Sequence, residues 1–410
     1  GRWCEWNGTA YVNPLAGVNG VVYDIKEAPN GDIYVCGLFT KVQNGGVDVP
    51  NTKGIARWSK ANQVWQAVGN PVTGATINSI NTMAFDANGD LYVGGYFTNL
   101  AGVTGANNFA KYTVASGVWS KIGSGINLLI YAIEISPDGT IYIGGVFTEA
   151  GGSTDCKRIA YFDKTANDWR PLSNGLNGIV NTLNFATDGR LLIGGEFTNA
   201  DGVNGDYICY WDGTAFKSFT DLGAPELNSN VHSLDITPNG TIIIGGTFTN
   251  AGGDPNADYI AAWRGNNWGA LMAGVVSSHV RKIFCLSNGD IYISGIFDHA
   301  GNIEVDRAAK SVGGAWQRLD IDLPESTAPI RALLEASDGT LYLCGDFSTT
   351  SSGQNAISAG AIDLNVSSGS ANTYPFISVM GPGKLNSIIN YSTGAHIEFN
   401  DLTLQKGEWI

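Results

Sequence analysis

One eleven-residue stretch recurs seven times in this 410-residue chain. In its clearest copy it runs from Asp138 to Thr148 and reads Asp-Gly-Thr-Ile-Tyr-Ile-Gly-Gly-Val-Phe-Thr. Every copy keeps a glycine at the turn, a second glycine six residues later and a phenylalanine two residues after that. The turn glycines are Gly31, Gly89, Gly139, Gly189, Gly240, Gly289 and Gly339. A period of about 50 residues is typical of propellers, solenoids or arrays, so the repeat constrains the fold more than length does.

Each copy predicts a β-hairpin. Apolar residues such as Val180, Leu183 and Phe185 precede the turn, and a β-rich run such as 141–143 follows it. Asn-Gly or Asp-Gly at the turn predicts a hairpin in which both turn residues adopt positive φ. The second glycine of each copy directly follows another glycine or another small residue. Missing Cβ atoms suit a bulge or a close backbone approach where neighbouring sheets pack.

Two further strands complete each repeat, because two aromatic positions follow most hairpins. The first set, expected on the third strand, is Trp58, Tyr112, Phe162, Trp211 and Trp263. The second set, expected on the fourth strand, is Trp65, Trp119, Trp169, Phe216, Trp268 and Trp316. The chain therefore predicts blades of four strands, here called a to d, with long and variable connections between strands b and c.

The ends of the repeat region suggest a closed ring. Residues 2–14 resemble an isolated c–d half, whereas the seventh a–b hairpin, near 330–348, has no obvious aromatic c–d pair after it. Pairing these halves removes two exposed sheet edges. We therefore predict an all-β fold: a seven-bladed β-propeller over residues 1–356, closed by strands at Trp3–Trp6 and Ala10–Val12. A linear solenoid is the rival, but it would need caps. Residues 357–410 form a separate small β module.

Charge and motif content exclude several classes of function. The net charge is −14 without any Lys/Arg run, so nucleic acid is not an expected partner. No apolar stretch reaches 18 residues, so membrane insertion is not expected. The four histidines are scattered and no Cys-x-x-Cys occurs, so we expect no metal and no cofactor. Acidic turns such as Asp86–Asp90 are interpreted as hairpin turns. No catalytic motif is present, although two carboxylates from separate blades could still act as a glycosidase.

The cysteines fall on repeat positions. Cys36 and Cys344 share one position and Cys4 and Cys209 share another, where other blades carry small residues. This pattern favours small buried side chains. Cys4 and Cys344 would lie on neighbouring strands of the closing blade, so a disulfide between them is left open.

The repeat resembles the Gly-Gly-x-Phe-Thr propeller repeats of bacterial surface and phage proteins, which are distantly akin to kelch and delta-60 repeats. The tail resembles a β module of siphophage tail proteins in these residues: Tyr374-Pro375, Gly381-Pro-Gly383, Asn390 to Gly394, Ile397-Glu-Phe399, Leu402-Thr-Leu404 and Gly407-Glu408. The tail match stops where another strand should follow. Both ends of the chain read as interrupted strands, so a fragment or processed product is expected.

The resemblance implies a non-enzymatic structural or receptor-binding protein of a phage tail or tail-like particle. Its expected partners are a host surface glycan or protein and other tail or particle subunits. Its expected location is the virion tail, or the extracellular space or cell surface. The alternatives are a secreted or cell-surface bacterial propeller used for adhesion and, third, a glycan-acting enzyme.

One repeat position varies in a way that suggests a site. It lies eight residues before each turn glycine, always after an apolar residue, and strand a is innermost in a propeller. These residues are therefore expected to ring the central channel near the b–c mouth, as a ligand-binding ring or as solvated lining. They are Tyr23, Asn81, Tyr131, Asn181, His232, Arg281 and Arg331. Two arginines on neighbouring blades can grip a carboxylate or sulfate, which predicts an acidic glycan as ligand.

Overall fold

The computed structural model describes residues 3–6, 11–12, 17–69, 76–272, 274, 277–319, 330–345, 383–390 and 395–404. In these ranges the chain is β throughout, apart from the short 3-10 turns η1 (Leu100–Gly102), η2 (Phe219–Leu222) and η3 (Ala251–Gly253). No described helix is long and apolar enough to cross a membrane. Contacts divide the chain into two units, Gly1–Ala361 and Ile362–Ile410. The predicted boundary at 356–357 lies outside the described residues.

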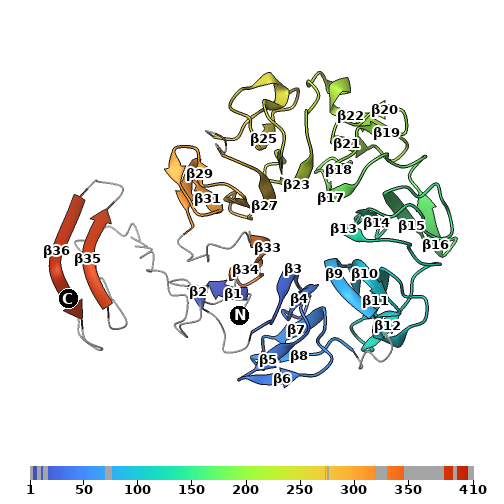
Figure 1. Ribbon diagram of the computed structural model, residues 1–410, viewed down its shortest axis with the longest axis horizontal. Helices are drawn as coiled ribbons and strands as arrows, with labels where there is room; N and C mark the ends of the chain where they lie inside the picture. The colour runs from blue at the N-terminus through green and yellow to red at the C-terminus, as the bar shows by residue number, and fades with distance from the viewer. Residues whose placement is uncertain are drawn as a thin grey trace. The chain divides into compact units, whose positions relative to one another are not determined.

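The first unit is a β-propeller of seven antiparallel four-stranded sheets around a common centre (Figure 1). Six sheets are continuous in sequence. From the centre outward, the first blade consists of β3 (Val21–Glu27), β4 (Ile33–Leu38), β7 (Ile55–Ser59) and β8 (Val64–Gln66), and the second of β9 (Thr76–Phe85), β10 (Leu91–Thr98), β11 (Phe109–Thr113) and β12 (Val118–Ser120). The third blade consists of β13 (Ile130–Ile135), β14 (Ile141–Gly145), β15 (Ile159–Asp163) and β16 (Asp168–Pro171), and the fourth of β17 (Val180–Phe185), β18 (Leu191–Gly195), β21 (Ile208–Trp211) and β22 (Phe216–Ser218). The fifth blade consists of β23 (Val231–Ile236), β24 (Ile242–Gly246), β25 (Ile260–Trp263) and β26 (Trp268–Ala270), and the sixth of β27 (Val280–Cys285), β28 (Ile291–Gly295), β31 (Ala308–Val312) and β32 (Ala315–Arg318).

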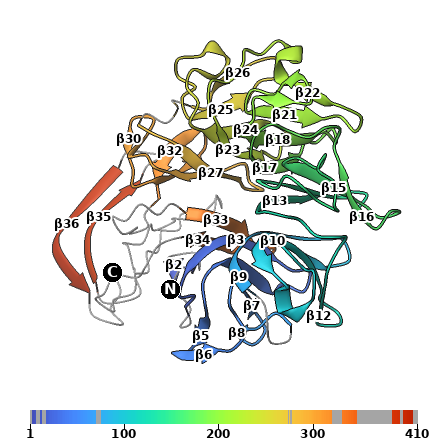
Figure 2. The same cartoon turned by 45° about the vertical axis from the view of Figure 1, so that its right-hand side comes forward.

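The seventh sheet joins the two ends of the propeller. Its order is β2 (Tyr11–Val12), β1 (Trp3–Trp6), β34 (Leu341–Gly345) and β33 (Ile330–Glu335). Strand β33 contacts both β27 and β3, so this blade lies between the sixth and the first (Figure 2). The predicted circular closure is therefore confirmed, although Ala10 lies outside the described residues.

In the closing blade, Cys4 pairs with Leu343 and Cys344 pairs with Trp3, so the two cysteines are offset by one residue along neighbouring strands. The possible disulfide between them stays a prediction. Elsewhere the expectation of small buried cysteines is confirmed, since Cys36 and Cys209 are both fully buried.

The prediction that both turn residues have positive φ is wrong. In the hairpin of the second blade, Asp86 donates its N–H to the Asp90 carbonyl, and Gly89 donates to the Asp86 carbonyl. Only Gly89 has positive φ, +80°. This is a three-residue loop whose last residue is left-handed. The Asp86 carboxylate accepts the N–H groups of Asn88 and Asp90, so the acidic turn is a hairpin turn, as expected.

The small residue and glycine at the end of each b strand have different structural roles. A Cβ on Gly144 would lie 2.4 Å from Val180 Cγ1 of the next blade, so the first position sets the distance between blades. In six of the seven blades, a Cβ on the second glycine would lie 2.0–2.4 Å from a carbonyl oxygen of strand a or of the residue just before it, as Gly195 would from Ile179 O. The second glycine thus lets strand a approach strand b closely. Both roles suggested by the sequence, a bulge and a close backbone approach, depend on this missing Cβ.

Aromatic packing holds each blade together. The expected c and d aromatics face each other across the strands, as in the pairs Trp58–Trp65 and Trp263–Trp268. Their ring centroids lie 5.4 Å and 5.1 Å apart in edge-on arrangements. The repeat phenylalanines are buried too, including Phe197. Burying one such side chain stabilises the fold by about 1.5–3 kcal/mol, so every repeat contributes its own share of core.

The b–c connections carry structure of their own. They hold three two-stranded hairpins: β5 (Val42–Asn44) with β6 (Val47–Val49), β19 (Asn199–Ala200) with β20 (Val203–Asn204), and β29 (His299–Ala300) with β30 (Ile303–Glu304). The second unit contains β35 (Gly383–Asn390), which pairs antiparallel with β36 (Ala395–Leu404). The other residues of the predicted β module lie outside the described part of the chain.

Candidate functional site

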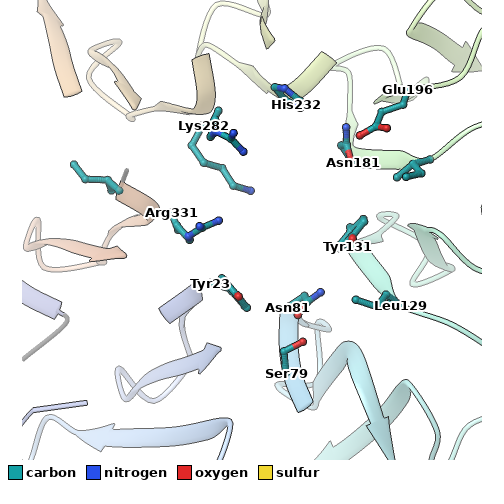
Figure 3. A pocket seen from close by; sticks show the side chains of 13 residues that line it. Tyr23, Ser79, Asn81, Leu129, Tyr131, Asn181, Glu196, His232, Lys282 and Arg331 are labelled. Carbon is teal, nitrogen blue, oxygen red and sulfur yellow. The ribbon is translucent and has the colours of Figure 1, made fainter. Parts of the chain in front are cut away.

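All seven residues of the predicted ring line one cavity of about 450 Å³ at the centre of the propeller (Figure 3). Each innermost strand contributes one of them: Tyr23 from β3, Asn81 from β9, Tyr131 from β13, Asn181 from β17, His232 from β23, Arg281 from β27 and Arg331 from β33. We call this set the channel ring. Pockets of this size are typical of small-ligand sites.

Each member of the channel ring is the extra residue of a β-bulge. In β17, Val180 pairs with Gly195 and Thr182 with Gly194, which leaves Asn181 without a partner position. The same shift occurs at the other six members. A bulge bends the strand and redirects a side chain. The second glycine makes this geometry possible, because a Cβ there would collide with the bulged strand.

Charge is distributed unevenly around the cavity. Arg281 and Lys282 come from β27 and Arg331 from β33, so two neighbouring blades supply three cations. Figure 3 places Lys282 and Arg331 on one side and Glu196 with Tyr131 on the other. Among the described residues, no ion pair within 4.0 Å involves these three cations or Glu196. Their charges are therefore available to a ligand.

Arg331 is oriented by an aromatic contact, but one of its hydrogen-bond donors has no partner. Its guanidinium lies over the Tyr23 ring, 5.3 Å from the centroid, a contact that orients the cation. Its Nε is buried and has no hydrogen-bond partner, and the same holds for the Asn81 side-chain oxygen. Buried polar atoms are nearly always hydrogen-bonded. Both atoms could therefore form a hydrogen bond with a ligand in the cavity.

His232 and Tyr131 of the channel ring are neutral at physiological pH. Burial lowers the pKa of His232 to about 4, and the charge of Arg281 adds to this effect. Burial also raises the pKa of Tyr131, with Glu196 contributing in the same direction. Asn181 donates its amide N–H to the Val231 carbonyl at 3.0 Å, which fixes its orientation. The cavity thus combines fixed neutral hydrogen-bonding groups with separated charges.

A second group of charges lies on the same innermost strands, three residues closer to the hairpin turns. Lys26 Nζ is 3.7 Å from Asp24 Oδ1, and its side chain is 45% exposed, so water reaches it. Burial raises the pKa of Glu134 to about 7, while Lys26 opposes this rise and Asp235 adds to it. The pKa of Asp235 is also raised by burial. Glu134 makes no hydrogen bond or ion pair within the described part of the chain.

We expect Glu134→Gln to stabilise the protein at pH 8 and to change little at pH 5. The pKa of Glu134 is about 7 in the folded state, against an ordinary value of 4.5. The folded state therefore favours the protonated carboxyl, and this stabilisation is lost as pH rises from about 4.5 to 7. Because water in the channel screens the charge, the gain at pH 8 should be about 1–2 kcal/mol. Denaturant unfolding at both pH values checks this. Equal effects at pH 5 and pH 8 would refute it.

Sequence reasoning missed two charged residues of the cavity. Lys282 follows Arg281 on β27 and also lines the cavity. Comparing the seven repeats at this position would have found it, because Lys282 is the only lysine among the seven residues. Glu196 occupies the variable position of Gly-Gly-x-Phe, where five blades carry an uncharged residue and only Glu196 and Asp346 are acidic, and this contrast was the available signal. Among the described residues of the b–c loops, which were expected above the ring, Glu196 alone lines the cavity. Within the described residues no acidic, His or Cys cluster could hold a metal ion.

Comparisons with known proteins find one family model over part of the chain and solved structures of varied function. The family model of the Rax2 C-terminal β-propeller domain matches residues 122–202. No curated protein matches the chain. Among solved structures, virginiamycin B lyase from Staphylococcus aureus is similar at 10% identity with a TM-score of 0.46, over 81% of this chain and 99% of that one.

Two further solved structures are similar at comparable levels. YCF48 bound to D1 peptide shares 15% identity with a TM-score of 0.48, over 84% of this chain and 97% of that one. The extracellular domain of the putative one component system BT4673 from B. thetaiotaomicron shares 13% identity with a TM-score of 0.41, over 71% of this chain and 38% of that one. The chain is a β-propeller, and these neighbours of varied function do not identify its ligand.

Proposed function

We propose that this protein is a non-enzymatic recognition module of a phage tail or tail-like particle. It binds a host surface glycan that carries an anionic group, and the channel ring is its binding site. The observation that carries the proposal is the cationic wall formed by Arg281, Lys282 and Arg331 in a chain of net charge −14. The resemblance of the tail segment to a siphophage module supports the particle assignment.

The chemistry of the wall suits a carboxylate, sulfate or phosphate. Arginine guanidinium groups bind such anions through paired, charge-assisted hydrogen bonds. Arg331 keeps a buried Nε without a partner, so an anion would satisfy an existing donor. Tyr23 and Tyr131 offer ring faces, and Asn81 and Asn181 offer amides, for the body of a sugar.

A glycan array tests the proposal. The intact protein should bind carboxylated, sulfated or phosphorylated glycans more strongly than neutral ones. Arg281→Ala with Arg331→Ala should weaken that binding at least tenfold, since hydrogen bonds to charged groups contribute about 1.5–3 kcal/mol each. The matched control is Arg170→Ala with Arg318→Ala, which removes the same charge from exposed positions on the outermost strands β16 and β32. Equal binding by the two double variants would refute the proposal.

A glycan-acting enzyme is the second candidate, because Glu134 and Asp235 both have raised pKa values in the channel. Two carboxyl groups of this kind are the usual machinery of glycoside hydrolysis. Asp235, however, accepts hydrogen bonds from the N–H groups of Ile236 and Cys285 and from Asn184. Neither carboxyl lines the cavity of the channel ring. Incubation with array-positive glycans should release no new reducing ends, and release that Glu134→Gln abolishes would favour the enzyme.

A further inference from the structure

The cavity holds two opposite charges that do not neutralise each other. Arg281, Lys282 and Arg331 form one wall, and Glu196 lies on the opposite side near Asn181 (Figure 3). The Glu196 side chain is exposed and makes no hydrogen bond or ion pair among the described residues. An uncompensated carboxylate inside an anion-binding cavity weakens the binding of a purely anionic ligand. The arrangement would suit a ligand whose own charges are also separated.

The groups around Glu196 match an ammonium ion. The charge of Glu196 helps to raise the pKa of Tyr131, so the two side chains influence each other electrostatically. Tyr131 is 38% exposed and lines the same cavity as Glu196. A carboxylate and an aromatic ring that line one cavity attract an ammonium group through charge and cation–π interaction. His232 stays neutral, so it does not repel a cation.

We infer that the channel ring binds a zwitterionic sugar, in which an acidic group lies against Arg281 and Arg331 and a free amine lies against Glu196. This inference rests on the proposed function, since it assigns the ligand class of the same site. The neutral lining residues Asn81 and Asn181 then bind the sugar hydroxyls. An N-acetylated sugar would lose the contact with Glu196 because its amide carries no charge.

Three small sugars at pH 7 test the inference by isothermal titration calorimetry. Glucosamine 6-phosphate carries both charges, N-acetylglucosamine 6-phosphate only the phosphate, and glucosamine only the amine. We expect glucosamine 6-phosphate to bind about tenfold more tightly than its N-acetylated form, as one charge-assisted contact predicts. Glu196→Gln should reduce this preference to within about twofold. Glu149→Gln removes the same charge outside the cavity lining and should keep the preference.

The outcomes separate this inference from the proposed function. Equal binding of the two phosphates by the unmodified protein would overturn the inference and leave the anion site intact. A preference that survives Glu196→Gln would also overturn it. If neither phosphate binds at millimolar concentration, the proposed function itself fails. Binding of glucosamine alone with the affinity of glucosamine 6-phosphate would assign the cavity to cations and contradict both.

Discussion

Removing residues 1–14 should lower the melting temperature by on the order of 10 °C or more. Strand β1 lies between β2 and β34 in the closing blade, so the deletion removes half of that sheet. It also leaves the backbone groups of β34 unpaired along one edge. The ring would then depend on only two strands, β33 and β34, to bridge its first and sixth blades. Circular dichroism melting of the full and shortened chains measures the effect.

A synthetic peptide of residues 1–14 provides the control for this deletion. If closure is the cause, adding the peptide to the shortened protein should restore part of the lost melting temperature in a concentration-dependent way. A peptide with the same composition in scrambled order should not. An unchanged melting curve for the shortened protein would show that β1 and β2 do not hold the ring closed.

Replacing Gly195 by alanine should cost about 3 kcal/mol or more of folding free energy. The added Cβ would lie 2.0 Å from Ile179 O and 3.0 Å from Phe197 Cδ1. The neighbouring backbone cannot move away without losing the bulge at Asn181, which lies beside the Val180–Gly195 pair. The variant should therefore also bind ligand less well. Chemical denaturation measures the stability change, and titration measures the binding.

Gly189→Asn is the matched control in the same blade. Gly189 is the turn glycine of this blade and has a φ of +87°, but a Cβ there would meet nothing within 4 Å. Asparagine tolerates left-handed backbone, so this change should cost less than about 1 kcal/mol. Equal losses for both variants would mean that the glycines matter only for backbone freedom. The bulge account requires a clear difference between them.

The fold could be predicted from the sequence because each repeat contains the residues that form the core of its own blade. The phenylalanine and the two aromatic positions specify the core of every blade, as the Trp58–Trp65 pair shows. The half-repeat at residues 2–14 specified closure for the same reason. The turn geometry could not be predicted as well, because Asp-Gly fits both a two-residue turn and the three-residue loop seen at Gly89.

The candidate site was predicted only in part. The channel ring could be found because its residues share one repeat position and vary in type there. Its bulges could not be derived, since a glycine such as Gly195 suits both a bulge and close packing. Lys282 was missed because its position carries a lysine in one blade only, and Glu196 was missed because its position was not compared between blades. The Lys26, Glu134 and Asp235 group also escaped notice, because their interaction depends on which blades lie across the channel.

A crystal structure of the protein with an array-positive acidic glycan would test the central claim most directly. That claim is that the channel ring, built from seven bulged residues, is the binding site. The account predicts the anionic group within hydrogen-bonding distance of the Arg281 and Arg331 guanidinium groups, with the sugar ring against Tyr23 or Tyr131. A glycan bound on the b–c loops or the outer strands, with the cavity holding only water, would contradict it.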